Sequence, residues 1–239
     1  MDVSQQDPRY YPRAGRRKPS LAEQLATFHA AMLARMTPGD AAAVRHYEQS
    51  VATAGAGLLA VGDAAPDFTL PDQHGRPVRL SDRMALGPVV LVFIRGGWCP
   101  FCTMMLRAWA DAAPSLHDAG GDLLAVSPQP VPACGGVAEC NLLPYPVLSD
   151  GDGIAATAYG VDLDVPAADR PLHQRLGHDI LAGRADGRWR APLPAVFVAG
   201  MDGRIALAHA DRVLACRLDP ATVVGAVRAL APGGNGHAT

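Results

Sequence analysis

The 239-residue sequence lacks the features that mark several large classes of protein. It has no apolar run of about 18 residues, so we expect no membrane-spanning helix and no membrane partner. The formal net charge is only −2, which argues against a nucleic-acid partner. No apolar stretch follows the N-terminal residues or the Arg16-Arg17 pair, so neither a signal peptide nor a twin-arginine export signal is expected.

Cysteine is scarce and odd in number, which does not fit the disulfide framework of a small secreted protein. The count fits a reducing compartment, the cytoplasm, with one or two functional thiols. Zinc needs four ligands, and the sequence offers no second Cys-x-x-Cys and no suitable pair of histidines. We therefore expect neither a metal nor a cofactor. The five cysteines are Cys99, Cys102, Cys134, Cys140 and Cys216.

The pattern of polar and apolar residues divides the chain into four parts. Residues 1–19 and 233–239 are polar or rich in glycine, and we expect disordered tails there. Residues 20–58 carry two helix-start signals and helical spacing of apolar residues, which predicts a helical hairpin. The hairpin would pack on the main domain, residues 59–232, or on a partner subunit, which leaves a homodimer open.

Within the main domain, apolar runs typical of strands alternate with helical patterns, and the domain ends in a hairpin and a helix. This order predicts an α/β fold of three layers with a mixed central sheet. Residues 89–94 are the central strand, since they form a continuous β-branched apolar run. Residues 128–146 contain five prolines and predict an irregular crossover. Residues 162–192 lack periodicity and are either a lid over the site described next or a surface excursion.

A Cys-x-x-Cys motif, Cys99 to Cys102, stands between the central strand and the helix predicted after it. At the start of a helix the two thiols share one face and are close enough for a disulfide. Pro100 suits the first helical position. The free N–H groups and the dipole of the first turn stabilise a thiolate, which is the nucleophilic form of cysteine.

Residues around the motif have supporting roles in this interpretation. Gly97, with Gly96, lets the backbone bend and approach a substrate closely. Arg95 is placed to hold an anionic or polarised oxygen near the thiolate, and Trp98 to shield the disulfide. The alternatives are two inert buried thiols or half of a metal site.

The remaining cysteines and histidines carry weaker signals. Cys134 and Cys140 are either an auxiliary disulfide or relay, or two unconnected thiols, and the second interpretation is favoured. Cys216 is expected to be a small packed residue. His173 and His178 are expected at the surface.

Three stretches resemble the alkyl hydroperoxide reductase and thiol-specific antioxidant (AhpC/TSA) superfamily. They are residues 62–70, residues 89–94 and the segment Gly97-Trp98-Cys99-Pro100-Phe101-Cys102. Within the superfamily, the chain is similar to the peroxiredoxin-like branch that carries a thioredoxin-type Cys-x-x-Cys. The resemblance covers about residues 60–231 and includes Arg217-Leu218-Asp219-Pro220. It implies a thioredoxin-like fold, and the N-terminal helical extension also fits that branch.

The family motifs give the two cysteines competing roles. In the peroxiredoxin pattern the peroxidatic cysteine falls on Cys102, while Arg95 and Cys99 occupy the positions of the motif's proline and threonine. In the thioredoxin pattern Cys99 is the exposed attacking thiol and Cys102 resolves. Pro194 then stands where thioredoxins keep a cis-proline. The distant arginine of peroxiredoxins would be Arg95 or an arginine from residues 170–190.

The resemblance implies a thiol-dependent oxidoreductase that reduces hydroperoxides through the Cys99/Cys102 pair. Its substrate would be a hydroperoxide or a disulfide, and an external thiol of the thioredoxin or glutathione type would reduce the pair again. One alternative is a thioredoxin-like thiol–disulfide reductase that acts on a protein partner. Another is a non-catalytic binding protein whose cysteine pair is structural or holds a metal such as copper(I).

Overall fold

The computed structural model describes residues 19–54, 57–181, 187–213 and 215–230. The predicted tails, apart from Pro19, lie outside these residues. The strands are β1 (Thr69–Pro71), β2 (Pro77–Arg79), β3 (Val89–Phe93), β4 (Asp122–Ser127), β5 (Val147–Ser149), β6 (Asp162–Asp164), β7 (Arg190–Pro192), β8 (Ala195–Ala199) and β9 (Ile205–Ala210). The helices are α1 (Leu21–Arg35), α2 (Pro38–Thr53), α3 (Leu80–Met84), α4 (Pro100–Asp118), α5 (Val131–Cys140), α6 (Ile154–Ala158), α7 (Arg170–Arg175) and α8 (Pro220–Leu230).

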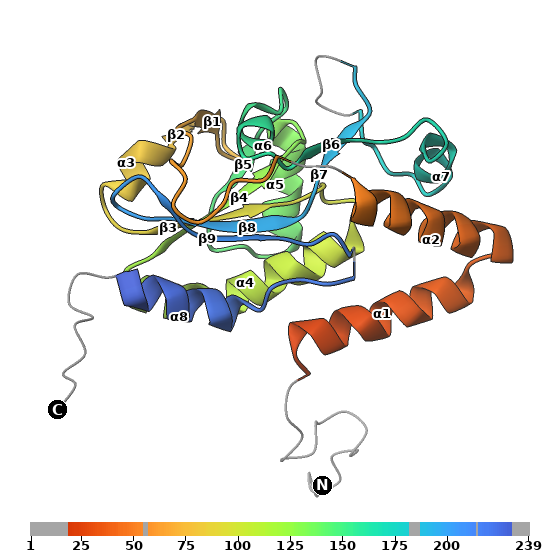
Figure 1. The fold of residues 1–239 in the computed structure, drawn as a ribbon, viewed down its shortest axis with the longest axis horizontal. Helices are drawn as coiled ribbons and strands as arrows, with labels where there is room; N and C mark the ends of the chain where they lie inside the picture. The colour runs from red at the N-terminus through yellow and green to blue at the C-terminus, as the bar shows by residue number, and fades with distance from the viewer. Residues whose placement is uncertain (1–18, 55–56, 182–186, 214, 231–239) are drawn as a thin grey trace, which may run out of the picture.

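Five strands form the central sheet in the order β5-β4-β3-β8-β9 (Figure 1). The pairs β5–β4 and β4–β3 are parallel, whereas β3–β8 and β8–β9 are antiparallel, so the sheet is mixed as predicted. Alternate residues of β3 point to opposite faces of the sheet. Val89, Leu91 and Phe93 belong to one apolar cluster, and Val90 and Val92 belong to a second. The central strand is therefore buried on both faces.

Helices and a small hairpin cover the two faces of the sheet (Figure 1). On one face lie α4 and α8, which contribute Trp109 and Val223 to the cluster that contains Val90. On the other face lie the β1–β2 hairpin, α3 and α6, and Leu80 joins the cluster that contains Phe93. These layers confirm the predicted three-layer α/β fold.

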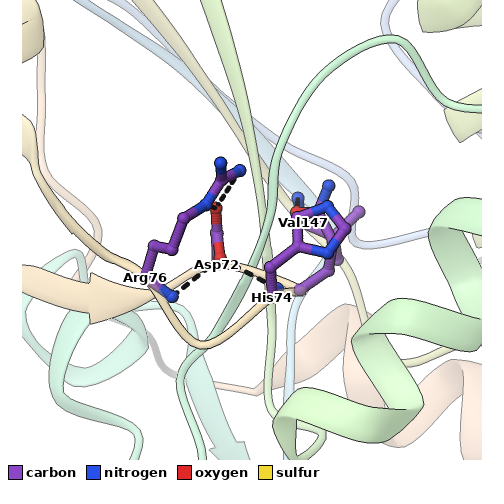
Figure 2. Close-up of polar contacts among 5 residues, drawn as sticks. Asp72, His74, Arg76 and Val147 are labelled. Atoms are coloured by element: carbon purple, nitrogen blue, oxygen red, sulfur yellow. Dashed lines mark hydrogen bonds and ion pairs between the residues drawn. The ribbon is translucent and has the colours of Figure 1, made fainter.

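The β1–β2 turn is fixed by a buried carboxylate and then tied to the sheet (Figure 2). Asp72 accepts backbone N–H groups from His74 at 2.8 Å and Arg76 at 2.9 Å, and also accepts from the Arg76 Nε at 2.9 Å. The neighbouring Gln73 Oε1 accepts the Val147 backbone N–H of β5 at 3.0 Å. The hairpin is therefore anchored beside the edge strand of the sheet.

The two N-terminal helices begin where the sequence predicts. The Ser20 side chain and the Glu23 carboxylate form a capping box at the start of α1. Thr37 caps α2. Helix α1 packs against α4, where Phe28 meets Phe101 edge to face at 5.4 Å between ring centroids, and α2 lies beside α7 (Figure 1). Both helices thus pack on the main part of their own chain, and the domain boundaries stay an interpretation.

Two segments are more regular than the sequence suggests. The predicted irregular crossover is wrong for residues 131–140, which form α5. Its prolines stand at the N-cap, Pro130, and in the first turn, Pro132, where a missing N–H costs nothing. Residues 162–192 contain β6, α7 and β7, and residues 182–186 lie outside the described part. Arg190 of β7 forms an ion pair with the buried Asp162 of β6 at 2.8 Å.

Candidate active site

The Cys-x-x-Cys motif lies between the end of β3 and the start of α4. Cys99 is the N-cap residue of α4, and Pro100 is its first helical residue. Cys102 follows in the first turn. The first turn leaves backbone N–H groups unpaired and carries the positive end of the helix dipole, so negative charge on sulfur is favoured there. Strand β3 is fully buried, and α4 packs through a buried face that includes Phe101 and Cys102, which fixes the two thiols relative to each other.

Both thiols are removed from solvent. Cys99 is 3% exposed and Cys102 is fully buried. The thioredoxin-type interpretation, in which Cys99 is an exposed attacking thiol, is therefore wrong about its exposure. Both are free thiols, and their side chains are hydrogen-bonded to each other.

The environment makes the two cysteines chemically different. Burial alone would raise the pKa of Cys102. It is outweighed by the hydrogen bond from Cys99, the positive charges of Arg217 and Arg95, and the Arg95 backbone N–H at 3.5 Å from Sγ, and the pKa falls to about 6. The same hydrogen bond, together with burial, raises the pKa of Cys99 well above its usual value. In this pair Cys102 is the thiolate and Cys99 keeps its proton.

Arg95 is a buried cation directly beside the cysteines. Its Nη2 donates to the Tyr47 hydroxyl at 2.6 Å, and its guanidinium lies 5.0 Å from the ring centres of both Tyr47 and Trp98. The backbone and the charge of Arg95 both act on Cys102. Because Tyr47 is on α2, the N-terminal extension contributes directly to the site.

A second arginine, Arg217, is a site residue that the sequence analysis does not single out. It is buried just before α8, and its charge lowers the pKa of both Cys99 and Cys102. The only signal for it in the sequence is its place in the Arg-Leu-Asp-Pro stretch of the family resemblance. Three of the arginines expected from residues 170–190 make contacts outside the site. Arg170 lies over Trp189, Arg175 pairs with Asp40, and Arg190 pairs with Asp162.

The glycines ahead of the motif are needed for packing. Gly96 has φ +138°, and a Cβ there would lie 2.7 Å from the Trp98 Nε1. The Gly97 N–H donates to the Gln129 Oε1 at 2.6 Å, and a Cβ on Gly97 would lie 2.4 Å from a methyl of Val137. The close approach at Gly97 is therefore to α5, whereas the sequence suggested an approach to a substrate.

Two histidines from the segment around α7 cover Trp98. His178 stacks on the Trp98 ring at 4.4 Å, and the Nδ1 atoms of His178 and His173 are 2.9 Å apart. Burial and then the Arg95 charge lower the pKa of His173 to about 3 and of His178 to about 4, so both rings are neutral at pH 7. The expectation of surface histidines is wrong, because His173 is 1% exposed and His178 is partly buried.

A cavity of about 250 Å³ lies between the N-terminal helices, the motif and the α7 segment. Cys99 stands in its wall, and Cys102 does not. The segment around α7 thus lies over the motif. The cavity is lined by Phe28, Met32, Met36, Val44, Tyr47, Glu48, Arg95, Trp98, Cys99, Pro100, Phe101, Leu172, His173, Leu176 and His178.

The other predicted site residues lie apart from the thiol pair. The peptide bond before Pro194 is trans, so the expected cis-proline is wrong. Cys134 is buried, which raises its pKa to about 11. Cys140 is exposed at the end of the same helix, about 9 Å further along its axis, which is too far for a disulfide between the two. Cys216 is exposed, although the sequence suggested a packed residue.

The described part of the chain has no group of three or more histidine, cysteine or acidic side chains that could hold a metal ion. Among the same residues, no helix is long and apolar enough to cross a membrane.

The chain is similar to known proteins. A model of the AhpC/TSA family matches residues 61–208. The chain is 37% identical over 103 residues to a candidate peroxiredoxin of Mycobacterium tuberculosis strain H37Rv, covering 43% of this chain and 67% of that protein. It is 38% identical over 104 residues to peroxiredoxin Bcp of Escherichia coli K12, covering 43% of this chain and 65% of Bcp. The chain thus spans about two thirds of the length of these relatives.

The fold is also found in a solved structure. The crystal structure of peroxidoxin BcpB from Mycobacterium tuberculosis superimposes with a TM-score of 0.58 at 26% identity, covering 72% of this chain and 97% of that one. Residues 61–208, which the family model matches, contain the central strand, the thiol pair and β8. We conclude that the chain belongs to the AhpC/TSA family and is a peroxiredoxin-like thiol oxidoreductase with a thioredoxin-like fold and an N-terminal helical extension.

Proposed function

We propose that the protein reduces hydroperoxides with Cys102 as the attacking thiolate and Cys99 as the resolving thiol. The observation that carries this assignment is the difference between the two sulfurs. Cys102 is held as a thiolate by two buried arginines, a backbone N–H and the thiol of Cys99. The nucleophile in thiol chemistry is the thiolate. Cys99, whose pKa is raised, suits the second role.

The reaction proceeds in two steps. The Cys102 thiolate attacks the terminal oxygen of the hydroperoxide, the O–O bond breaks, and Cys102 becomes a sulfenic acid. The departing oxygen takes up a proton and leaves as an alcohol or water. Cys99 then attacks the sulfenic sulfur, water is released, and the Cys99–Cys102 disulfide forms. The arginine charges oppose protonation of Cys102 before the first step and stabilise the negative charge that develops on the departing oxygen.

An external thiol donor closes the cycle by reducing the disulfide. Such a donor is kept in its reduced form in a reducing compartment. The cytoplasm is a compartment of this kind, and it fits the five free thiols of the protein. A homodimer stays a prediction.

Single-turnover kinetics of cysteine variants test the assignment. The variants are made in a Cys140→Ser/Cys216→Ser background, which removes the two exposed thiols. With Cys102→Ser we expect no fast peroxide consumption, and with Cys99→Ser we expect one turnover that ends in a sulfenic acid. The reverse result would make Cys99 the nucleophile.

The rival function, a thiol–disulfide reductase for a protein partner, rests on the position of the Cys-x-x-Cys at the start of a helix. Stopped-flow oxidation of the reduced protein by hydrogen peroxide and by an organic hydroperoxide separates the two functions. We expect at least one of them to oxidise Cys102 far faster than it oxidises free cysteine. Rates no higher than those of free cysteine with both oxidants would favour the reductase.

A further inference from the structure

The disulfide formed in each turnover has only one sulfur within reach of the cavity. Cys99 stands in the cavity wall, whereas Cys102 lies behind it and is fully buried. Thiol–disulfide exchange requires the incoming thiolate to contact the sulfur that it attacks. A reductant that uses this cavity therefore attacks Cys99.

Side chains packed around the cavity restrict the access of a protein thiol to Cys99. Phe28 of α1 lies on Phe101, and His178 stacks on Trp98. Tyr47 of α2 is hydrogen-bonded to Arg95. These contacts close over the motif from three directions, and Cys99 is only 3% exposed beneath them. A reductant small enough to enter the cavity of about 250 Å³ does not have to displace these side chains.

The cavity also has a definite chemical character. Most of its lining is apolar, with Met32, Met36 and Leu176 among the side chains. Among the described residues that line the cavity, Glu48 is the one acidic group, and it contacts His29 at 2.8 Å. In the same set Arg95 is the one cation; its charge acts on the cysteines and would favour an incoming thiolate. Carboxylates on the body of a reductant would lose their hydration beside apolar groups and Glu48, which disfavours them.

Two aromatic side chains in the lining, Trp98 and His173, each carry a buried ring nitrogen without a hydrogen-bond partner among the described residues. His173 is 1% exposed, its Nδ1 faces His178, and its Nε2 is the atom without a partner. A few placed polar groups in an apolar cavity are typical of small-molecule sites, where they orient the ligand. An uncharged polar group, such as an amide, would satisfy the Nε2 of this neutral histidine.

We propose that the electron donor is a small, uncharged dithiol with an aliphatic body, which enters the cavity and attacks Cys99 of the Cys99–Cys102 disulfide. The donor thiolate forms a bond to the Cys99 sulfur, and Cys102 leaves as a thiolate. The second thiol of the donor then attacks the donor sulfur of the mixed disulfide and releases Cys99. Two electrons pass to the protein, the donor ends as a cyclic disulfide, Cys99 keeps one proton, and the other goes to solvent.

The charges around the pair support this direction of attack. The better leaving group in thiol exchange is the thiol with the lower pKa. Cys102 is that thiol, since Arg217 and Arg95 stabilise its negative charge. This inference rests on the proposed function, because it supplies the reductant for the disulfide which that function forms.

The test follows reduction of the disulfide by stopped-flow fluorescence of Trp98 and the other tryptophans. The full chain in the Cys140→Ser/Cys216→Ser background is oxidised by one equivalent of hydroperoxide and, separately, by diamide. The reductants are dihydrolipoamide, dihydrolipoic acid, glutathione and a reduced thioredoxin, compared at equal thiolate concentration. We expect dihydrolipoamide to be faster than each of the others by about tenfold or more. Dihydrolipoic acid carries the same dithiol with a carboxylate, so it isolates the effect of charge.

A pair of variants tests the route. Met36→Glu places a charge in the cavity and should slow reduction of the disulfide by dihydrolipoamide about tenfold. Ala34→Glu puts the same charge on the exposed side of α1 and should leave that rate unchanged. The inference is overturned if thioredoxin or glutathione equals dihydrolipoamide, or if Met36→Glu has no effect. A third outcome is that diamide forms the Cys99–Cys102 disulfide, hydroperoxide does not, and dihydrolipoamide still reduces this disulfide faster than the other reductants. In that case the peroxidase proposal fails and this inference stands.

Discussion

The hydroxyl of Tyr47 lies 2.6 Å from the Nη2 of Arg95, so a residue of the N-terminal helical extension holds the buried cation beside the two cysteines. The contact is buried on both sides. It gives the extension a role in the chemistry of the thiol pair, in addition to its packing on α4. The extension also supplies several side chains that line the cavity over Cys99.

Removal of the Tyr47 hydroxyl should make the thiolate form of Cys102 less favourable. In Tyr47→Phe, Arg95 loses a restraint, and we expect the pKa of Cys102 to rise by about one unit, or about 1.4 kcal/mol. A pH titration of the ultraviolet thiolate absorbance measures the shift. Tyr145→Phe is the matched control, because it removes a buried hydroxyl that donates to the Leu106 carbonyl away from the thiols. An unchanged Cys102 pKa in Tyr47→Phe would mean that Tyr47 does not position Arg95.

Loss of the second buried cation should have a larger effect. We expect Arg217→Gln to raise the pKa of Cys102 by about one to two units, since an adjacent positive charge favours the thiolate. Oxidation by peroxide at neutral pH should slow accordingly. The control is Arg228→Gln on the exposed side of α8, which should leave both quantities as they are. If Arg217→Gln behaves like this control, Arg217 is only a packing residue.

The rate of thiol oxidation should depend on pH in a way that distinguishes Cys102 from free cysteine. Below its pKa of about 6, Cys102 is protonated and the reaction is slow. As the pH rises through about 6 the thiolate forms, so the rate should rise there and be level at neutral pH. Free cysteine has a pKa of about 8.5 and continues to gain rate up to that pH. Stopped-flow oxidation between acidic and mildly basic pH checks this, and a midpoint near that of free cysteine would contradict it.

The glycine beside α5 should tolerate no side chain. Gly97→Ala would place a Cβ 2.4 Å from a Val137 methyl, and we expect a loss of about 1–3 kcal/mol in the free energy of unfolding. Urea denaturation measures it. The double variant Gly97→Ala/Val137→Ala should recover part of the loss by making room. Gly136→Ala on α5 meets open space and should be neutral or stabilising by up to about 1 kcal/mol. Equal stability of Gly97→Ala and wild type would refute the close packing.

Local patterns in the sequence were sufficient for the elements that carry the fold. The apolar run that became β3, the capping residues Ser20 and Thr37, and Pro100 at the first position of α4 each act through neighbours a few residues away. Such signals are strong because they depend on backbone geometry and on burial of a continuous segment. The position of the thiol pair followed from the same elements.

The same local reasoning failed where prolines and polar residues were read without their surroundings. Pro130 and Pro132 suggested an irregular segment, yet both stand where a helix needs no N–H, and α5 forms behind them. His173 was expected at the surface, although it is buried. Its burial comes from Tyr47 and Trp98, which are distant in the chain.

The sequence by itself determined a thioredoxin-like α/β fold and two thiols at the start of a helix. Which thiol is ionised was decided only by the tertiary structure. Arg217, from a segment more than a hundred residues later in the chain, and Arg95, held by Tyr47 from α2, both act on Cys102. Electrostatic stabilisation depends on distance in space and on exclusion of water. Neither quantity can be obtained from the spacing of residues along the chain.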